Sequence, residues 1–132
     1  VLPDLINKCL KGQDPLHILG DGSQVRCYTH GKDIARGIVM AMESDAAINE
    51  DFNISIDMPT NVLHLAEEVW NEINPSKPFQ WTCDKPYEYD VQMRMPDVSK
   101  AEKLLGFKAT IPLKQSIKEV TEWMRENMNE KE

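Results

Sequence analysis

The sequence has 132 residues, 41% of them apolar and 28% charged, with 15 basic and 22 acidic side chains and a formal net charge of −7. This length suits one compact domain and excludes a free-standing enzyme of several domains. The acidic balance, without a long basic run, excludes nucleic acid as the leading partner, and no apolar run approaches the roughly 20 residues of a membrane span.

The first third of the chain predicts a short helix followed by two extended segments. Pro3 suits the first turn of that helix, and Gly12 is expected to end it. Residues 15–19 form a predicted strand, residues 20–23 a tight glycine turn and residues 24–30 a second extended segment. A strand, a turn and a strand in this order are typical of a hairpin.

The middle of the chain predicts two helices with a strand between them. Asp33 is expected to cap a helix that ends near residue 43, residues 52–56 alternate like a strand, and Asn61 begins the second helix. A period of 3.6 residues predicts the buried faces, which are Ile34, Ile38, Ala41 and Met42 on the first helix and Val62, Leu65, Ala66, Val69, Trp70 and Ile73 on the second.

The last third predicts a short strand, a loop and two helices. Residues 79–82 suggest the strand, and residues 84–96 lack any period and form the loop. Asp97 is the expected cap of a helix that ends before Gly106, where a left-handed residue is favoured. Pro112 starts the final helix, whose predicted inward positions are Leu113, Ile117, Val120, Met124 and Met128.

These elements make one α+β domain over residues 1–132, with about five helices and four short strands. A complete doubly wound nucleotide-binding sheet is not encoded, because the sequence lacks a series of continuously apolar strands that each precede a helix. The three cysteines are an odd number without metal-ligand spacing, which favours a reducing cytoplasm over a disulfide framework. The chain begins with Val1 and enters a helix at once, so we expect a piece of a longer protein.

Arg26 follows the glycine turn and is the first candidate anion-binding residue. Gly20 and Gly22 permit close approach of the backbone, and the planar guanidinium of Arg26 can hold two anionic oxygens. A phosphate or diphosphate is the ligand that this pattern favours. The alternative is a hairpin turn followed by a surface arginine.

The loop before Asp97 holds the second candidate, because loops on a rigid scaffold often carry ligand contacts. It offers two tyrosines, the carboxylate of Asp90 and the guanidinium of Arg94, which could converge with Arg26 on one dianionic group. The alternative is a solvated loop. Asn61 either caps its helix through its side chain or leaves backbone N–H groups free for an anion.

Several motifs in order resemble the extended short-chain dehydrogenase/reductase family that acts on sugar nucleotides. The run Pro-Leu-His-Ile-Leu-Gly-Asp-Gly-Ser-Gln-Val-Arg at residues 15–26 is similar to that family's Pro-Leu-x-Ile-x-Gly-Asp-Gly-x-Gln-x-Arg, and an aspartate that opens a helix follows in both. The resemblance continues through residues 52–54, residues 63–67 and the Arg-Met-Pro-Asp-Val-Ser-Lys-Ala run at residues 94–101, and covers nearly the whole chain.

The resemblance implies the C-terminal, substrate-binding part of an NAD-dependent sugar-nucleotide epimerase or dehydratase. Arg26 and Arg94 would hold the diphosphate or ribose, with Asp90 in the same loop as Arg94. The strand that contains His17 and Leu19 would lie beside the base. By the same resemblance, the helix start at Asn61 would reach the diphosphate.

The family's N-terminal Rossmann sheet, its glycine-rich NAD(P) turn and its Tyr-x-x-x-Lys pair have no match in this chain. Tyr28 and Lys32 have that spacing, but they stand at the wrong place in the family's order. We therefore expect no cofactor bound by this chain alone and no hydride transfer. Gly31 and residues 55–57 also depart from the family's pattern.

We therefore expect a binder of nucleoside diphosphate sugars, monomeric and cytoplasmic, that lacks its Rossmann partner domain and has no nucleic-acid or membrane partner. The alternative is an acidic α+β module that descends from such a domain and binds a protein. A third alternative is an enzyme completed by a separately encoded Rossmann half.

Overall fold

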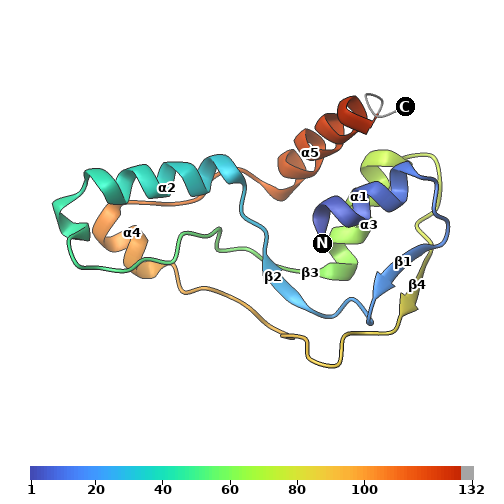
Figure 1. Ribbon diagram of the computed structural model, residues 1–132, viewed down its shortest axis with the longest axis horizontal. Helices are drawn as coiled ribbons and strands as arrows, with labels where there is room; N and C mark the ends of the chain where they lie inside the picture. Colours follow the sequence, from blue (N-terminus) through green and yellow to red (C-terminus); the bar gives the residue numbers. More distant parts are fainter. Residues whose placement is uncertain (129–132) are drawn as a thin grey trace.

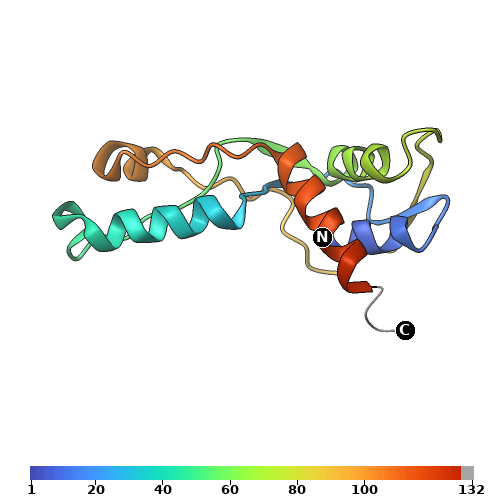
Figure 2. The same ribbon diagram turned by 90° about the horizontal axis from the view of Figure 1, so that it is seen from above.

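Two groups of helices lie at opposite ends of an elongated molecule (Figures 1 and 2). The computed structural model describes residues 1–128, with Met128 described by its backbone only. In chain order the elements are α1 (Leu2–Leu10), β1 (Leu16–Leu19), β2 (Val25–Cys27), α2 (Gly31–Glu43), the 3-10 turn η1 (Asp45–Ala47), β3 (Pro59–Asn61), α3 (Val62–Ile73), β4 (Trp81–Asp84), α4 (Ser99–Leu105) and α5 (Leu113–Met128). No described helix combines the length and the hydrophobicity needed to cross a membrane.

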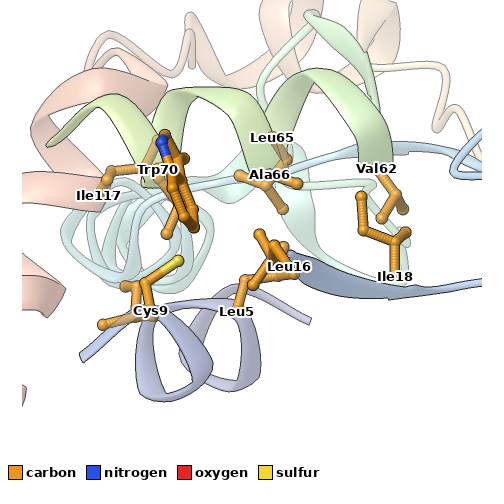
Figure 3. Packing of buried hydrophobic residues seen from close by; sticks show 11 residues of the cluster. Leu5, Cys9, Leu16, Ile18, Val62, Leu65, Ala66, Trp70 and Ile117 are labelled. Atoms are coloured by element: carbon orange, nitrogen blue, oxygen red, sulfur yellow. The ribbon is translucent and has the colours of Figure 1, made fainter. Parts of the chain in front are cut away.

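The main core lies at the end formed by α1, α3, α5 and β1 (Figure 3). The amphipathic helix α3 contributes the face that its 3.6-residue period predicts, and Trp70 is only 1% exposed. The indole N–H of Trp70 donates to the Lys77 carbonyl at 3.2 Å, which satisfies its polar atom. The buried cluster consists of Leu5, Ile6, Cys9, Leu16, Ile18, Val62, Leu65, Ala66, Val69, Trp70 and Ile117.

The four strands form two separate two-stranded sheets. Strand β1 pairs in parallel with β4, and β2 pairs antiparallel with β3. The predicted hairpin between residues 15–19 and 24–30 is therefore wrong. Gly22 has a φ of +76°, and a Cβ there would lie 2.9 Å from Leu63 Cβ, so this turn closes on the start of α3 and directs the chain into a second sheet.

Helix α2 begins at Gly31, and its cap is His30, whose Nδ1 accepts from the Lys32 N–H at 3.0 Å. The prediction that Asp33 caps this helix is wrong. Asp33 is only 1% exposed and accepts hydrogen bonds from Arg36 and from the N–H groups of Thr110 and Ile111. Burial raises the pKa of the Asp33 carboxyl, but these hydrogen bonds outweigh burial and hold the pKa below its usual value.

Two of the four residues on the predicted apolar face of α2, Ile38 and Met42, are exposed, whereas Ile34 and Ala41 are half-buried. Ile38 is 51% exposed, Val39 50% and Met42 81%, whereas Gly37 packs against the side chains of Ile54 and Phe107. The burial prediction for Ile38 and Met42 is therefore wrong, because the described residues cover the Asp33 and Gly37 side of the helix and only part of its apolar side.

The remaining element predictions differ in detail. Residues 52–56 are extended but belong to no described strand, and β3 lies at Pro59–Asn61. Helix α4 starts at Ser99 instead of residue 98, although the Asp97 carboxylate still accepts from the Ser99 N–H at 2.9 Å. Gly106 has the predicted left-handed conformation, with a φ of +66°.

Candidate functional site

A cavity of about 380 Å³ lies between α1, β1, the start of α3 and the loop over residues 85–96. It gathers four of the predicted site residues, His17, Leu19, Arg26 and Asp90, from segments far apart in the sequence. We call it the first cavity. Its lining also includes apolar side chains from three elements, namely Leu5, Ile18 and Val62, together with the polar residues Asp4, Lys8, Gln24 and Tyr87.

A second cavity, of about 520 Å³, shares Val1 and Arg26 with the first cavity. Arg26 and Arg94 both line it, as do Tyr28 and Ser116. Arg26 therefore belongs to the lining of both cavities. The two arginines that the sequence singled out thus share one hollow, although 68 positions separate them.

The Arg26 side chain is held by its own strand β2 and by the loop that carries Arg94. Nη1 donates to the Val25 carbonyl at 2.7 Å, and Nη2 lies 3.3 Å from Asp90 Oδ1. The side chains of Arg26 and Asp90 are 22% and 24% exposed, respectively. Partial burial strengthens this ion pair relative to one in open water.

Backbone hydrogen bonds fix the position of Arg94. The Val25 N–H donates to the Gln92 carbonyl at 2.8 Å, and the Arg94 N–H donates to the Val25 carbonyl at 3.0 Å. These bonds join the loop to β2 next to Arg26. The Arg94 side chain is exposed, and within residues 1–128 its guanidinium has neither an ion pair nor a hydrogen bond.

The backbone N–H and C=O of His17 face away from β4, whereas its ring contacts the end of β4. Its backbone N–H donates to Gln13 Oε1 at 3.0 Å, and its carbonyl accepts from Lys8 Nζ at 3.1 Å. The His17 ring bonds through Nδ1 to Asp84 Oδ1 at 2.8 Å. The N–H groups of Leu16 and Gly20 donate to β4, so the alternation of a parallel ladder directs the Leu19 N–H to the opposite edge.

Asn61 caps α3, since its Oδ1 accepts from the His64 N–H at 2.7 Å. The next two donors are also occupied, because the Val62 N–H bonds to the Gln24 carbonyl and the Leu63 N–H to the Gly22 carbonyl. Asn61 does not line either cavity. Of the two alternatives for Asn61, this geometry favours capping.

Replacing Asn61 with alanine is therefore expected to destabilise the protein by about 1 kcal/mol, because the His64 N–H loses its acceptor. The free energy of unfolding in urea measures this loss. Asn61→Asp is the matched control, since it keeps an acceptor oxygen. A loss as large in the aspartate variant would contradict the capping role.

The sequence analysis did not propose three of the lining residues as ligand contacts, namely Lys8, Gln24 and Tyr28. Tyr28 follows Arg26 at the two-residue spacing that puts side chains on one face of a strand, so this signal was present. Burial raises the pKa of the Tyr28 phenol, while the charge of Arg26 lowers it. The Tyr28 hydroxyl is buried without a partner among the described residues.

The other groups that could carry chemistry are the metal-ligating side chains, the cysteines and Lys32. The described part of the chain has no group of three His, Cys, Asp or Glu side chains placed to hold a metal. Its three cysteines are free, and burial raises the pKa of Cys9 to about 11. Lys32, which has the Tyr-x-x-x-Lys spacing to Tyr28, instead pairs with Glu119 at 3.1 Å.

Comparisons with known proteins place this arrangement in context. A family model described as GDP-mannose 4,6 dehydratase matches residues 1–120. A Methanocaldococcus jannaschii protein described as a candidate UDP-glucose 4-epimerase is 37% identical over 129 residues, which is 96% of this chain and 39% of that protein.

Two solved structures are also similar. An epimerase from Methanothermobacter thermautotrophicus is 25% identical with a TM-score of 0.86, over 98% of this chain and 38% of that one. UDP-glucuronic acid 4-epimerase from Bacillus cereus, in complex with UDP-glucuronic acid and NAD, is 27% identical with a TM-score of 0.81, over 92% of this chain and 38% of that one. The chain thus spans about two fifths of the length of these proteins.

Proposed function

Because the chain belongs to the GDP-mannose 4,6 dehydratase family, we propose that it binds a nucleoside diphosphate sugar as the substrate-binding part of an NAD-dependent epimerase or dehydratase. The observation that carries this proposal is the position of Arg26 in the walls of both cavities. The nucleoside occupies the first cavity, and the diphosphate lies across Arg26 and Arg94.

The first cavity suits a base. Its lining combines the apolar side chains of Leu5, Ile18 and Val62 with the edge of β1, where the Leu19 N–H faces away from β4. A flat heterocycle needs this combination of apolar walls and in-plane hydrogen-bonding groups. His17 and Leu19 thereby lie beside the base, as the family resemblance implies.

The second cavity suits an anion. Arg26 and Arg94 both line it, and none of its lining residues within the described part of the chain is Asp or Glu. Charge-assisted hydrogen bonds from arginine to phosphate oxygens are about twice as strong as neutral ones. The diphosphate therefore belongs on the side of Arg26 that faces Arg94.

The residues present do not fit a dinucleotide site. The sequence has no Gly-x-Gly-x-x-Gly turn, and residues 1–128 form two sheets of only two strands each. NAD would supply hydride transfer in a complete family protein. This chain would accordingly hold and orient the substrate.

We propose that the exposed apolar side of α2 packs against the nucleotide-binding part of a family protein. Ile38, Val39 and Met42 lie together on this helix and are each at least half exposed. The neighbouring extended residues 52–56 have no strand partner among the described residues, and relatives of the chain have more than half of their length outside the match. A second candidate function, an interaction module for an unrelated protein, would use this same surface and would not need Arg26 or Arg94.

An NMR titration tests the proposed function. The chain is titrated with UDP-, dTDP-, GDP- and ADP-sugars, and amide shifts are mapped on the natural sequence and on the Arg26→Ala/Arg94→Ala variant. We expect shifts around Leu19, Arg26 and Arg94 that vanish in the variant, with an affinity weaker than micromolar because the ligand is enclosed from one side only. Absence of shifts at millimolar ligand would contradict binding by this chain and favour the interaction module.

A further inference from the structure

We propose that Asp90 competes with the anionic ligand for Arg26 and so determines how strongly the site accepts a diphosphate. This inference rests on the proposed function. In the structure, Asp90 Oδ1 lies 3.3 Å from Arg26 Nη2, at the point where the first cavity meets the guanidinium. A diphosphate that binds Arg26 must displace this carboxylate or bind next to its negative charge.

The loop that carries Asp90 is attached to β2 directly after the carboxylate. Val25 bonds to the Gln92 carbonyl and to the Arg94 N–H, which ties the backbone on the C-terminal side of Asp90 to β2. Asp90 can therefore leave Arg26 mainly by rotating its own side chain.

The two arginines differ in whether a carboxylate already neutralises their charge. Arg26 is neutralised by Asp90, whereas Arg94 is exposed and, within the described ranges, has no carboxylate partner. An anion therefore reaches an available charge at Arg94 first. It gains Arg26 only when it replaces Asp90, which favours a ligand with more than one anionic group.

Asp90→Asn keeps the size of the side chain and removes the competing charge. We expect it to tighten the binding of inorganic pyrophosphate and of UDP about tenfold, as befits one unit charge a few ångströms from the ligand in a partly exposed site. Uridine, which carries no charge, should bind within about twofold of its affinity for the natural chain. Isothermal titration calorimetry at fixed salt measures all three ligands.

Glu88→Gln is the matched control, because it removes the same charge from the same loop and Glu88 has no ion pair among the described residues. It should leave all three affinities within about twofold. In the Asp90→Asn/Arg26→Ala variant the gain should disappear, since Arg26 is the group that Asp90 releases.

Two outcomes separate this inference from the proposed function. If pyrophosphate and UDP bind the natural chain through Arg26 but Asp90→Asn leaves their affinity unchanged or weaker, the competition is refuted and the binding function stands. If neither the natural chain nor Asp90→Asn binds UDP, both are refuted. Thermal unfolding followed by circular dichroism verifies that each variant is folded.

Discussion

Replacing Arg26 with alanine is expected to weaken UDP binding by roughly 10- to 100-fold, the value of hydrogen bonds to a charged group. Arg26 is mostly buried, lines both cavities and is already oriented by the Val25 carbonyl, so little ordering is needed when the ligand arrives. Arg94 is exposed, and its replacement should cost less. Calorimetric titration of each variant with UDP measures both losses.

Arg125→Ala provides the control, because it removes the same charge from the exposed surface of α5, away from both cavities. Its UDP affinity should equal that of the natural chain at moderate salt. An equal loss in Arg26→Ala and Arg125→Ala would mean that general charge, and not the geometry around Arg26, governs binding.

Replacing Asp33 with alanine should lower the free energy of unfolding by about 3 kcal/mol, because a buried charged acceptor of three hydrogen bonds is lost. These bonds attach α2 to residues 110–111, so the end of the molecule formed by α2 and α4 should loosen first. Urea unfolding measures the loss. Glu67→Ala, an exposed change on α3, should stay within about 0.5 kcal/mol.

The same carboxylate gives the stability a pH dependence. The pKa of Asp33 is lower in the folded protein than in the unfolded chain, so its contribution is present above the unfolded pKa and is lost as pH falls through the folded value. The natural chain should therefore lose more stability than Asp33→Asn below about pH 4. Equal acid sensitivity of the two would contradict the role of Asp33.

The helices could be predicted from local periodicity, because the apolar residues of a helix recur on one side of it. The apolar residues of α3 recur at helical spacing, and those from Val62 to Trp70 are buried. Helix α2 has an equally regular pattern but exposes Ile38 and Met42. A sequence pattern indicates which side of a helix is apolar, but it cannot indicate whether anything covers that side.

Strand pairing was the harder part, because it depends on partners far along the chain. Leu16 pairs with Trp81, and nothing near either residue announces the other. The glycines at residues 20 and 22 suggested a hairpin, yet their positive φ angles turn the chain toward α3. Local turn chemistry specifies a change of direction without specifying which strand follows as neighbour.

The candidate site was predicted mainly from collinear motifs. Arg26, Arg94, His17, Leu19 and Asp90 do line the cavities, whereas Asn61 is occupied as a cap. The ion pair between Arg26 and Asp90 had no signal in the sequence, because it forms through the bridge between Val25 and the loop.

Because Arg26 lines both cavities, the covalent bond between a nucleoside and its diphosphate strengthens binding. A nucleoside held in one cavity presents its attached diphosphate to Arg26 and Arg94 at a high effective concentration, so the second contact is intramolecular. Uridine and pyrophosphate added together should each bind far more weakly than UDP, even though the contacts are the same. The arrangement of two modest cavities around one arginine would thus distinguish an intact nucleotide from a mixture of its parts.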